Sequence, residues 1–254
     1  MKTLKIFISM LMIAMLFTIS ACSDDDEEIV NTHDDAYVDV LTKKMMMMMG
    51  NPKYLPIFFA GGEEIVADGS SVTGPDGTLY DLHSFWAGAG KLIAAGQPEN
   101  DMPVAGTYTF KLKFSDGYIK NLTDILEGED TTVPQITLSY SQNASPQTIE
   151  VSWTASPEAD FYCVKLVEID SATGKPADAK PFYKVPMIDK TNLSHIIKID
   201  GSNGWMRPVS ELQNDTDYFI VLTAKKVESG TPVIGNSQNF EVNGCSKTRF
   251  TYHQ

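Results

Sequence analysis

The sequence has few of the residues that carry chemistry in enzymes and metal proteins. It holds four histidines and three cysteines in 254 residues. It contains no HExxH zinc motif, no CxxC pair, no GxSxG nucleophile elbow and no phosphate-binding loop. We therefore predict no catalytic residue, no cofactor, no metal site and no enzymatic activity. Paired catalytic carboxylates stay open as an alternative, because 33 acidic residues offer many pairs and no spacing distinguishes one of them.

Positive charge is also scarce. The chain has 20 basic and 33 acidic residues, which gives a formal net charge of −13. Proteins that bind nucleic acid depend on lysine and arginine to neutralise phosphates, and no basic stripe compensates for the deficit here. The composition therefore excludes nucleic acid as the expected partner.

A long apolar run is missing as well. The run from Ile6 to Ile19 would rise only about 21 Å as a helix, which is short of the ~30 Å hydrocarbon core of a membrane. Lys2 and Lys5 precede it, and small residues follow it. This order is that of a cleaved secretion signal, so we predict that residues 1–21 are removed.

The residues that end this segment, Ile19-Ser20-Ala21-Cys22, resemble a bacterial lipobox. The resemblance implies that Cys22 becomes the first residue of the mature chain and carries acyl chains, which hold a protein on a membrane without a span. An ordinary signal peptide that happens to end in cysteine is the alternative. The acidic residues 24–28 resemble the export tag of surface lipoproteins in some Gram-negative bacteria. The resemblance implies an outer-membrane protein that faces the cell exterior, with residues 22–32 as a solvated tether.

The remainder of the chain predicts an all-β protein of two β-sandwich domains in tandem. Residues 106–114 alternate strictly between apolar and polar side chains, as a half-buried antiparallel strand does. Short strand-like runs separated by glycine turns assign residues 33–128 to an N-terminal domain. The segment from Gly128 to Pro134 is polar and contains a glycine and a proline, which indicates a linker at residues 129–133. Residues 134–243 form the second domain, and residues 244–254 follow as an extension that either adds an edge strand or frays.

The second domain resembles fibronectin type III domains. The register of that family is matched by Leu212, Thr216, Tyr218, Ile220, Leu222 and Ala224, whereas Asn214 stands where the family usually has proline. The resemblance implies that Trp153 fills the core between two sheets and that Tyr218 forms a tyrosine corner with nearby backbone. Both are structural roles.

The other two cysteines, Cys163 and Cys245, lie in a chain that is expected in an oxidising compartment. A disulfide between them and two free thiols are both open, because the sequence does not place them within bridging distance.

Ligand contacts are expected from tryptophans beside glycines in loops. Trp86 and Trp205 fit this pattern, and exposed rings stack on sugars or anchor protein partners. The alternative for each is a lid folded over the core. Ser171 and Thr131 lie in short motifs similar to O-glycosylation acceptors of surface lipoproteins. We therefore expect a non-catalytic, lipid-anchored surface protein that binds a glycan or a protein. A structural or adhesive subunit, whose C-terminal segment pairs with the sheet edge of another chain, is the alternative, and an enzyme without a recognisable motif comes third.

Overall fold

The computed structural model describes residues 33–46, 51–85, 90–177, 180–230 and 239–254. Two units are distinguished, 1–35 and 36–254, and all of the assigned elements belong to the second unit. The predicted signal peptide, tether and Cys22 lie outside the described residues, as does Trp86. No helix in the described ranges is long and apolar enough to cross a membrane.

Strands make up nearly all of the regular structure, and the prediction of an all-β fold is confirmed. The only helical element assigned in the described ranges is the 3₁₀ turn η1 (Val209–Glu211). The strands of the first half are β1 (Tyr37–Met45), β2 (Lys53–Gly61), β3 (Ile65–Thr73), β4 (Leu79–Asp81), β5 (His83–Ser84), β6 (Lys91–Ala95), β7 (Gly106–Phe114) and β8 (Ile119–Leu126). Those of the second half are β9 (Ile136–Ser141), β10 (Thr148–Trp153), β11 (Phe161–Glu168), β12 (Tyr183–Asp189), β13 (Ser194–Lys198), β14 (Thr216–Val227) and β15 (Phe240–Tyr252).

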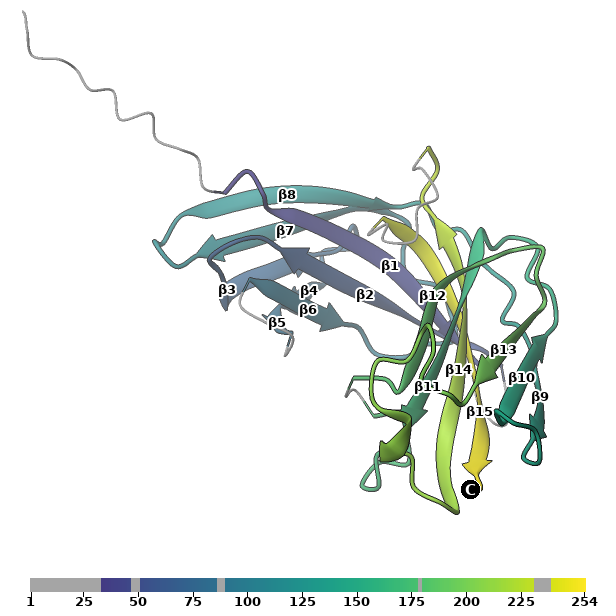
Figure 1. Ribbon diagram of the computed structural model, residues 1–254. Coiled ribbons are helices and arrows are strands. Elements are labelled where there is room, and N and C mark those ends of the chain that lie inside the picture. Colours follow the sequence, from purple (N-terminus) through teal and green to yellow (C-terminus); the bar gives the residue numbers. More distant parts are fainter. Residues whose placement is uncertain (1–32, 47–50, 86–89, 178–179, 231–238) are drawn as a thin grey trace, which may run out of the picture. The chain divides into compact units, whose positions relative to one another are not determined.

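Three sheets arise from these strands (Figure 1). The largest has eight strands in the order β12-β11-β14-β15-β1-β2-β6-β5. A four-stranded sheet, β4-β3-β7-β8, packs on the β1-β2-β6 end, and a three-stranded sheet, β13-β10-β9, packs on the β12-β11-β14-β15 end. Each half of the chain is therefore a sandwich, and one large sheet takes part in both.

The core of the N-terminal half comes from alternating side chains on both layers. Val40, Phe58 and Leu92 face it from the large sheet, and Phe110 and Phe114 face it from β7. The strand β7 has the same bounds as the run that alternates in the sequence, with Tyr108, Phe110, Leu112 and Phe114 buried. Alternation identified this strand because one face of its sheet packs on the core while the other meets solvent.

The core of the C-terminal half is separate and contains the residues that the fibronectin resemblance assigned to it. Trp153 is 6% exposed and packs on Tyr162 with a ring separation of 5.3 Å. The hydroxyl of Tyr218 accepts a hydrogen bond from the backbone N–H of Gln213 at 2.9 Å, and its ring packs on Phe182. These are the contacts that a core tryptophan and a tyrosine corner require.

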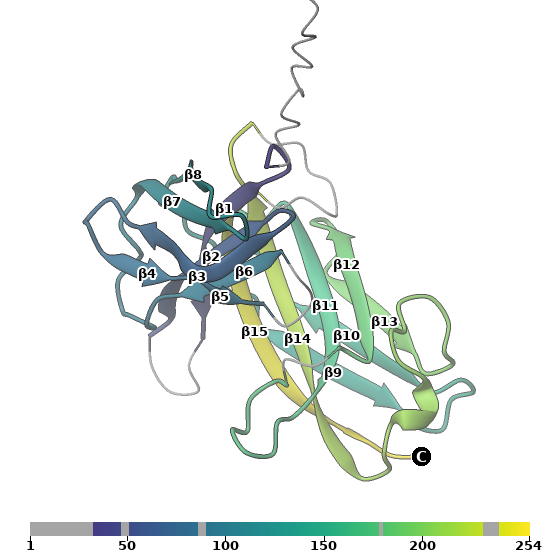
Figure 2. The same ribbon diagram turned by 90° about the vertical axis from the view of Figure 1, so that its left-hand side faces the viewer.

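The two halves are joined through β1 and β15, which pair in parallel between Thr42–Met45 and Val242–Cys245 (Figure 2). Residues 36–254 thus form one compact unit, which differs from the predicted division at residues 129–133. Residues 244–252 belong to β15 and pair with β14. Only residues 244 and 245 of this segment also pair with β1, so β15 is an edge strand from residue 246 to residue 252, as one of the two alternatives predicted. The sequence could not show that β1 and β15 join the halves, because strand pairing between residues about 200 positions apart leaves no local pattern.

Candidate functional site: an aromatic pocket beside a carboxylate cluster

A pocket of about 230 Å³ opens where the N-terminal half of the large sheet meets the start of β15. Its walls include Tyr37 and Asp39 from β1, Phe59 from β2, Phe85, Lys91 from β6, and Phe240 from β15. On the strands, these side chains alternate with those that face the N-terminal core, so the same alternation that builds the core also builds the pocket. The backbone N–H of Phe85 donates to the carbonyl of Lys91 at 2.8 Å, which fixes this wall to β6.

Four aromatic rings dominate the pocket. Phe59 and Phe85 meet edge to face with their centroids 6.5 Å apart. The ammonium of Lys225 lies 3.7 Å from the centroid of the Phe240 ring, a cation–π contact that holds this ring in place. All four rings are half-buried, so each retains surface that a ligand can cover. Such a wall suits the apolar face of a sugar ring or another flat group.

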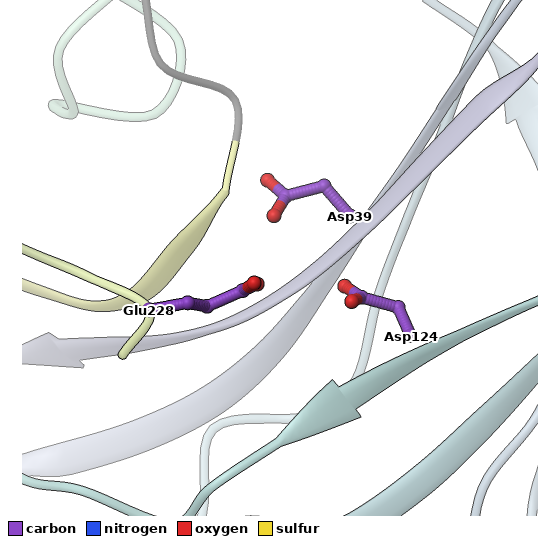
Figure 3. A group of neighbouring side chains, drawn as sticks. All are labelled: Asp39, Asp124 and Glu228. Atoms are coloured by element: carbon purple, nitrogen blue, oxygen red, sulfur yellow. The ribbon is translucent and has the colours of Figure 1, made fainter. Parts of the chain in front are cut away.

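Three carboxylates gather behind the pocket. Asp39 on β1, Asp124 on β8 and Glu228, directly after β14, place carboxylate oxygens within 4.8 Å of one another (Figure 3). Asp39 accepts a hydrogen bond from the N–H of Phe240 at 3.2 Å, and Asp124 accepts one from the N–H of Val40 at 2.7 Å. One carboxylate oxygen of Glu228 is buried without a hydrogen-bond partner in the described structure.

The electrostatics of this cluster follow from burial and like charge. Asp39 is 3% exposed, and burial raises its pKa to about 8, with smaller contributions from Asp124 and Glu228. Burial, followed by the charge of neighbouring acids, raises the pKa of Glu228 to about 7. Burial also raises the pKa of Asp124. At neutral pH, Asp39 is therefore mostly a neutral carboxylic acid that can donate a hydrogen bond.

These three residues are also the group in the described structure whose chemistry suits a metal ion. Carboxylate oxygens at these separations match the ligands of a hard divalent cation such as Ca²⁺. The sequence analysis predicted no metal, and no local signal could have revealed the cluster. Its members lie on three segments separated by at least 85 positions in the chain, and only the tertiary fold brings them together.

A fourth acid, Glu241, has a different environment. Its side chain is fully buried and accepts hydrogen bonds from the N–H groups of Glu127, Gly128 and Glu129 at 2.9, 2.8 and 3.0 Å. Burial raises its pKa, while these three donors favour the ionised form. The side chain ties β15 to the segment that follows β8, so it fastens the C-terminal half to the N-terminal half.

Trp205, the other predicted ligand contact, lies in the C-terminal half. Its indole N–H donates to the carbonyl of Lys198 at 2.8 Å, and its ring packs on Tyr183 with 5.5 Å between centroids. The residue is half-buried against the core of that half. These contacts fit the alternative of a lid better than a ligand contact. The pocket residues were missed because Tyr37, Asp39, Phe59 and Phe240 read as ordinary strand residues.

The cysteines do not form a disulfide. Cys163 and Cys245 are both free, and each lies opposite Thr223, Cys163 on β11 and Cys245 on β15. Two strand spacings separate them, roughly 10 Å at ~4.8 Å per spacing. A disulfide requires Cα atoms within about 4.4–6.8 Å, so the two thiols are too far apart to bridge.

The two predicted O-glycosylation residues differ in accessibility. Ser171 is exposed in a turn after β11. Thr131 is 1% exposed, and its hydroxyl is hydrogen-bonded to that of Ser156 at 2.9 Å. The folded chain therefore offers Ser171, and not Thr131, to a modifying enzyme.

Comparison with known proteins does not place the chain in a family. No family model and no curated protein matches the sequence. Among solved structures, a DUF4785 family protein from Legionella pneumophila is similar over 74% of this chain, with 10% sequence identity and a TM-score of 0.23. The match spans 52% of that protein, about half its length.

Proposed function

We propose that this chain is a lipid-anchored envelope protein that binds a glycan and does not process it. The anchor is supported by the lipobox-like residues that end at Cys22 and by the acidic run behind them. The acidic run supports outward display at the outer membrane. This part of the proposal rests on the sequence.

The observation that supports glycan binding is the aromatic pocket with its polar groups. Sugar rings combine apolar C–H faces with a rim of hydroxyls, and this pocket offers four aromatic rings together with Asp39 and Lys91. At about 230 Å³, it is smaller than the ~300–1,000 Å³ of pockets that enclose drug-sized ligands. It therefore suits a single ring of a larger molecule.

A hydrolase is less well supported by the same geometry. Glycoside hydrolysis needs two carboxyl groups that both reach the scissile bond. Only Asp39 of the carboxylate cluster lines the pocket, and Asp124 and Glu228 do not. A subunit that donates its C-terminal strand to a neighbour is also less well supported, because β15 already pairs with β14 of its own chain along its length and with β1 between Val242 and Cys245.

A glycan array probed with the purified chain tests this proposal. We expect binding to at least one glycan, and a loss of at least tenfold in affinity for Phe85→Ala, because this half-buried ring forms a wall of the pocket. Trp205→Ala is the matched control, since it removes a half-buried aromatic ring from the other half, and should bind as the wild type does. Binding lost in Trp205→Ala and kept in Phe85→Ala, or hydrolysis of the bound glycan, would contradict the proposal.

A further inference from the structure

Five lysines point away from the cores on the outer face of the large sheet, the face on which the aromatic pocket also opens. They come from five consecutive strands of that sheet, β12, β11, β14, β15 and β1. We call them the lysine face: Lys184, Lys165, Lys225, Lys247 and Lys43. Lys184 lies directly opposite Lys165, and alternate residues of the same strands, such as Val164 and Leu222, enter the C-terminal core. Because each strand contributes one lysine to this face, the sequence shows no basic stripe.

The charge of the lysine face is not neutralised. In the part of the chain that the structure describes, none of these five lysines forms an ion pair with a carboxylate. Asp217 and Asp189 point to the same face, but Asp217 pairs with Arg249 at 3.6 Å and Asp189 accepts hydrogen bonds from Thr191. In a chain with 33 acidic and 20 basic residues, a surface with unpaired positive charge reverses the general balance.

The lysines of this face repel one another. Burial lowers the pKa of Lys225, and the charges of Lys165 and Lys184 act in the same direction. Partial burial also lowers the pKa of Lys247, and so do three neighbouring cations, which include Lys43. Like charges held together destabilise the free protein, and an anionic ligand would remove that repulsion.

Lys225 connects the lysine face with the aromatic pocket. Its ammonium lies 3.7 Å from the centroid of Phe240, which is a wall of the pocket. On β1, Lys43 lies on the same side of the strand as Asp39, which also lines the pocket. A chain-like ligand with one unit in the pocket can therefore continue along the outer face without crossing the sheet.

The type of cation indicates the type of anion. Phosphates and nucleic acids favour arginine, whose planar fork matches a phosphate group. The unpaired cations here are all lysines, each of which supplies a single point charge. Their five strands span four spacings, about 19 Å at ~4.8 Å per spacing. A row of single positive charges over this length matches a polymer that carries one carboxylate on each sugar.

We infer that the glycan is a polyuronate, an acidic polysaccharide with a carboxylate on each sugar, with one sugar in the aromatic pocket and the following sugars along the lysine face. This inference rests on the proposed function and names the class of glycan. It also gives the outer surface of the C-terminal half a part in binding, while the core of that half stays structural.

Calorimetric titration with oligomers of galacturonate and of mannuronate tests the inference, with neutral galactose and mannose oligomers of the same length beside them. We expect at least one uronate series to bind at least tenfold more tightly than its neutral counterpart. Its affinity should fall at least tenfold between about 50 and 200 mM salt, because screening weakens contacts between exposed charges.

The double variant Lys165→Gln/Lys184→Gln should lose at least tenfold in affinity for uronates and nothing for neutral oligomers. Removing two charges that repel Lys225 should not lower the melting temperature, so unfolding does not explain the loss. Lys111→Gln/Lys198→Gln is the matched control. It removes the same charge from exposed positions on the two smaller sheets, and should bind uronates as the wild type does.

Four results would overturn the inference and leave glycan binding in place. They are equal affinity for uronate and neutral oligomers, an equal loss in the two double variants, tighter binding of heparin, and tighter binding of single-stranded DNA. Phe85→Ala should weaken uronate binding as well, and uronate affinity that is unchanged in this variant would contradict a site shared with the pocket. Absence of binding to every oligomer and to every glycan of the array would overturn both the inference and the proposed function.

Discussion

The two halves of the compact unit use one sheet for different purposes. The C-terminal half buries its conspicuous aromatic residues, Trp153 and Tyr218, in a continuous core, and half-buries Trp205 against that core. The N-terminal half contributes three of the four aromatic rings around the pocket, with Phe240 of β15 as the fourth. It also contributes two of the three clustered carboxylates, with Glu228 from the end of β14 as the third. Natural proteins keep buried charge where function needs it. Under the proposed function, the C-terminal half is the scaffold, and the N-terminal half, together with Phe240, carries the binding pocket.

The largest expected effect is a loss of stability without a loss of glycan binding, caused by a substitution in the core of the C-terminal half. Trp153→Ala should lower the free energy of unfolding by about 3–5 kcal/mol, because it empties a large buried site. Urea unfolding measures this loss. Glycan affinity of the folded fraction should stay at the wild-type value, since the residue lies in the other core. A midpoint equal to that of the wild type would show that Trp153 is not part of the core.

The next largest expected loss of stability concerns the Glu241 hydrogen bonds that connect the two halves. Glu241→Ala leaves the N–H groups of Glu127, Gly128 and Glu129 without their acceptor, and we expect a loss of about 3 kcal/mol. Because these contacts tie β15 to the N-terminal half, calorimetry should show a lower melting temperature. Glu228→Ala, which removes a carboxylate from the repulsive cluster, is the control and should not lower it. Equal losses in the two variants would contradict the role of Glu241.

The carboxylate cluster predicts an unusual pH dependence. The pKa of Asp39 is raised from 3.8 to about 8 in the fold, so the folded state holds the proton where the unfolded state has lost it. Stability should therefore fall as pH rises from about 4 to about 8. Lys225, whose charge favours the ionised form of Asp39, opposes this trend, while Asp124 and Glu228 strengthen it.

Unfolding measured in urea between pH 6 and 8 should show a loss of about 2 kcal/mol from Asp39, since one proton accounts for ~1.4 kcal/mol per pH unit. Glu228, whose pKa is raised to about 7, adds a smaller loss in the same direction. Asp39→Asn should flatten most of this slope, because an amide keeps an acceptor for the Phe240 N–H and carries no titrating proton. A slope of the same size in Asp39→Asn would show that the cluster is not its source. Stability that rises over this range would contradict the assigned protonation.

The smallest expected loss of stability tests whether Trp205 acts as a lid over the core of the C-terminal half. Trp205→Ala removes one hydrogen bond to Lys198 and partial ring packing on Tyr183, so we expect a loss of about 1–2 kcal/mol. Thermal melting measures it, beside the glycan titration in which this variant behaves as the wild type does. A loss as large as that of Trp153→Ala would place Trp205 among the principal core residues.

Local patterns in the sequence predicted what local forces determine. The strand β7 follows from alternation, because one of its faces meets the core. The pair Asp68-Gly69 has the residue types of a strand break, yet it lies within β3, where a bulge between Val66 and Ser71 absorbs the extra residues. A bulge and a strand break share the same residue types, so the sequence could not distinguish them.

The pairing of strands that lie far apart in the sequence could not be predicted, because local patterns do not record it. The parallel pairing of β1 with β15 joins Thr42 to Val242, and the pocket and the carboxylate cluster both depend on that pairing. Side chains such as Asp39 and Phe240 carry no signal in their own neighbourhoods. Their role arises only when residues 200 positions apart lie side by side.

A crystal structure of the chain with a bound glycan from the array tests the contrast between the halves most directly. We predict a sugar ring between Phe59 and Phe85 of the N-terminal half and Phe240 of β15. A glycan with no ring in that pocket, seated instead against Trp205 or anywhere on the C-terminal sandwich, would contradict it.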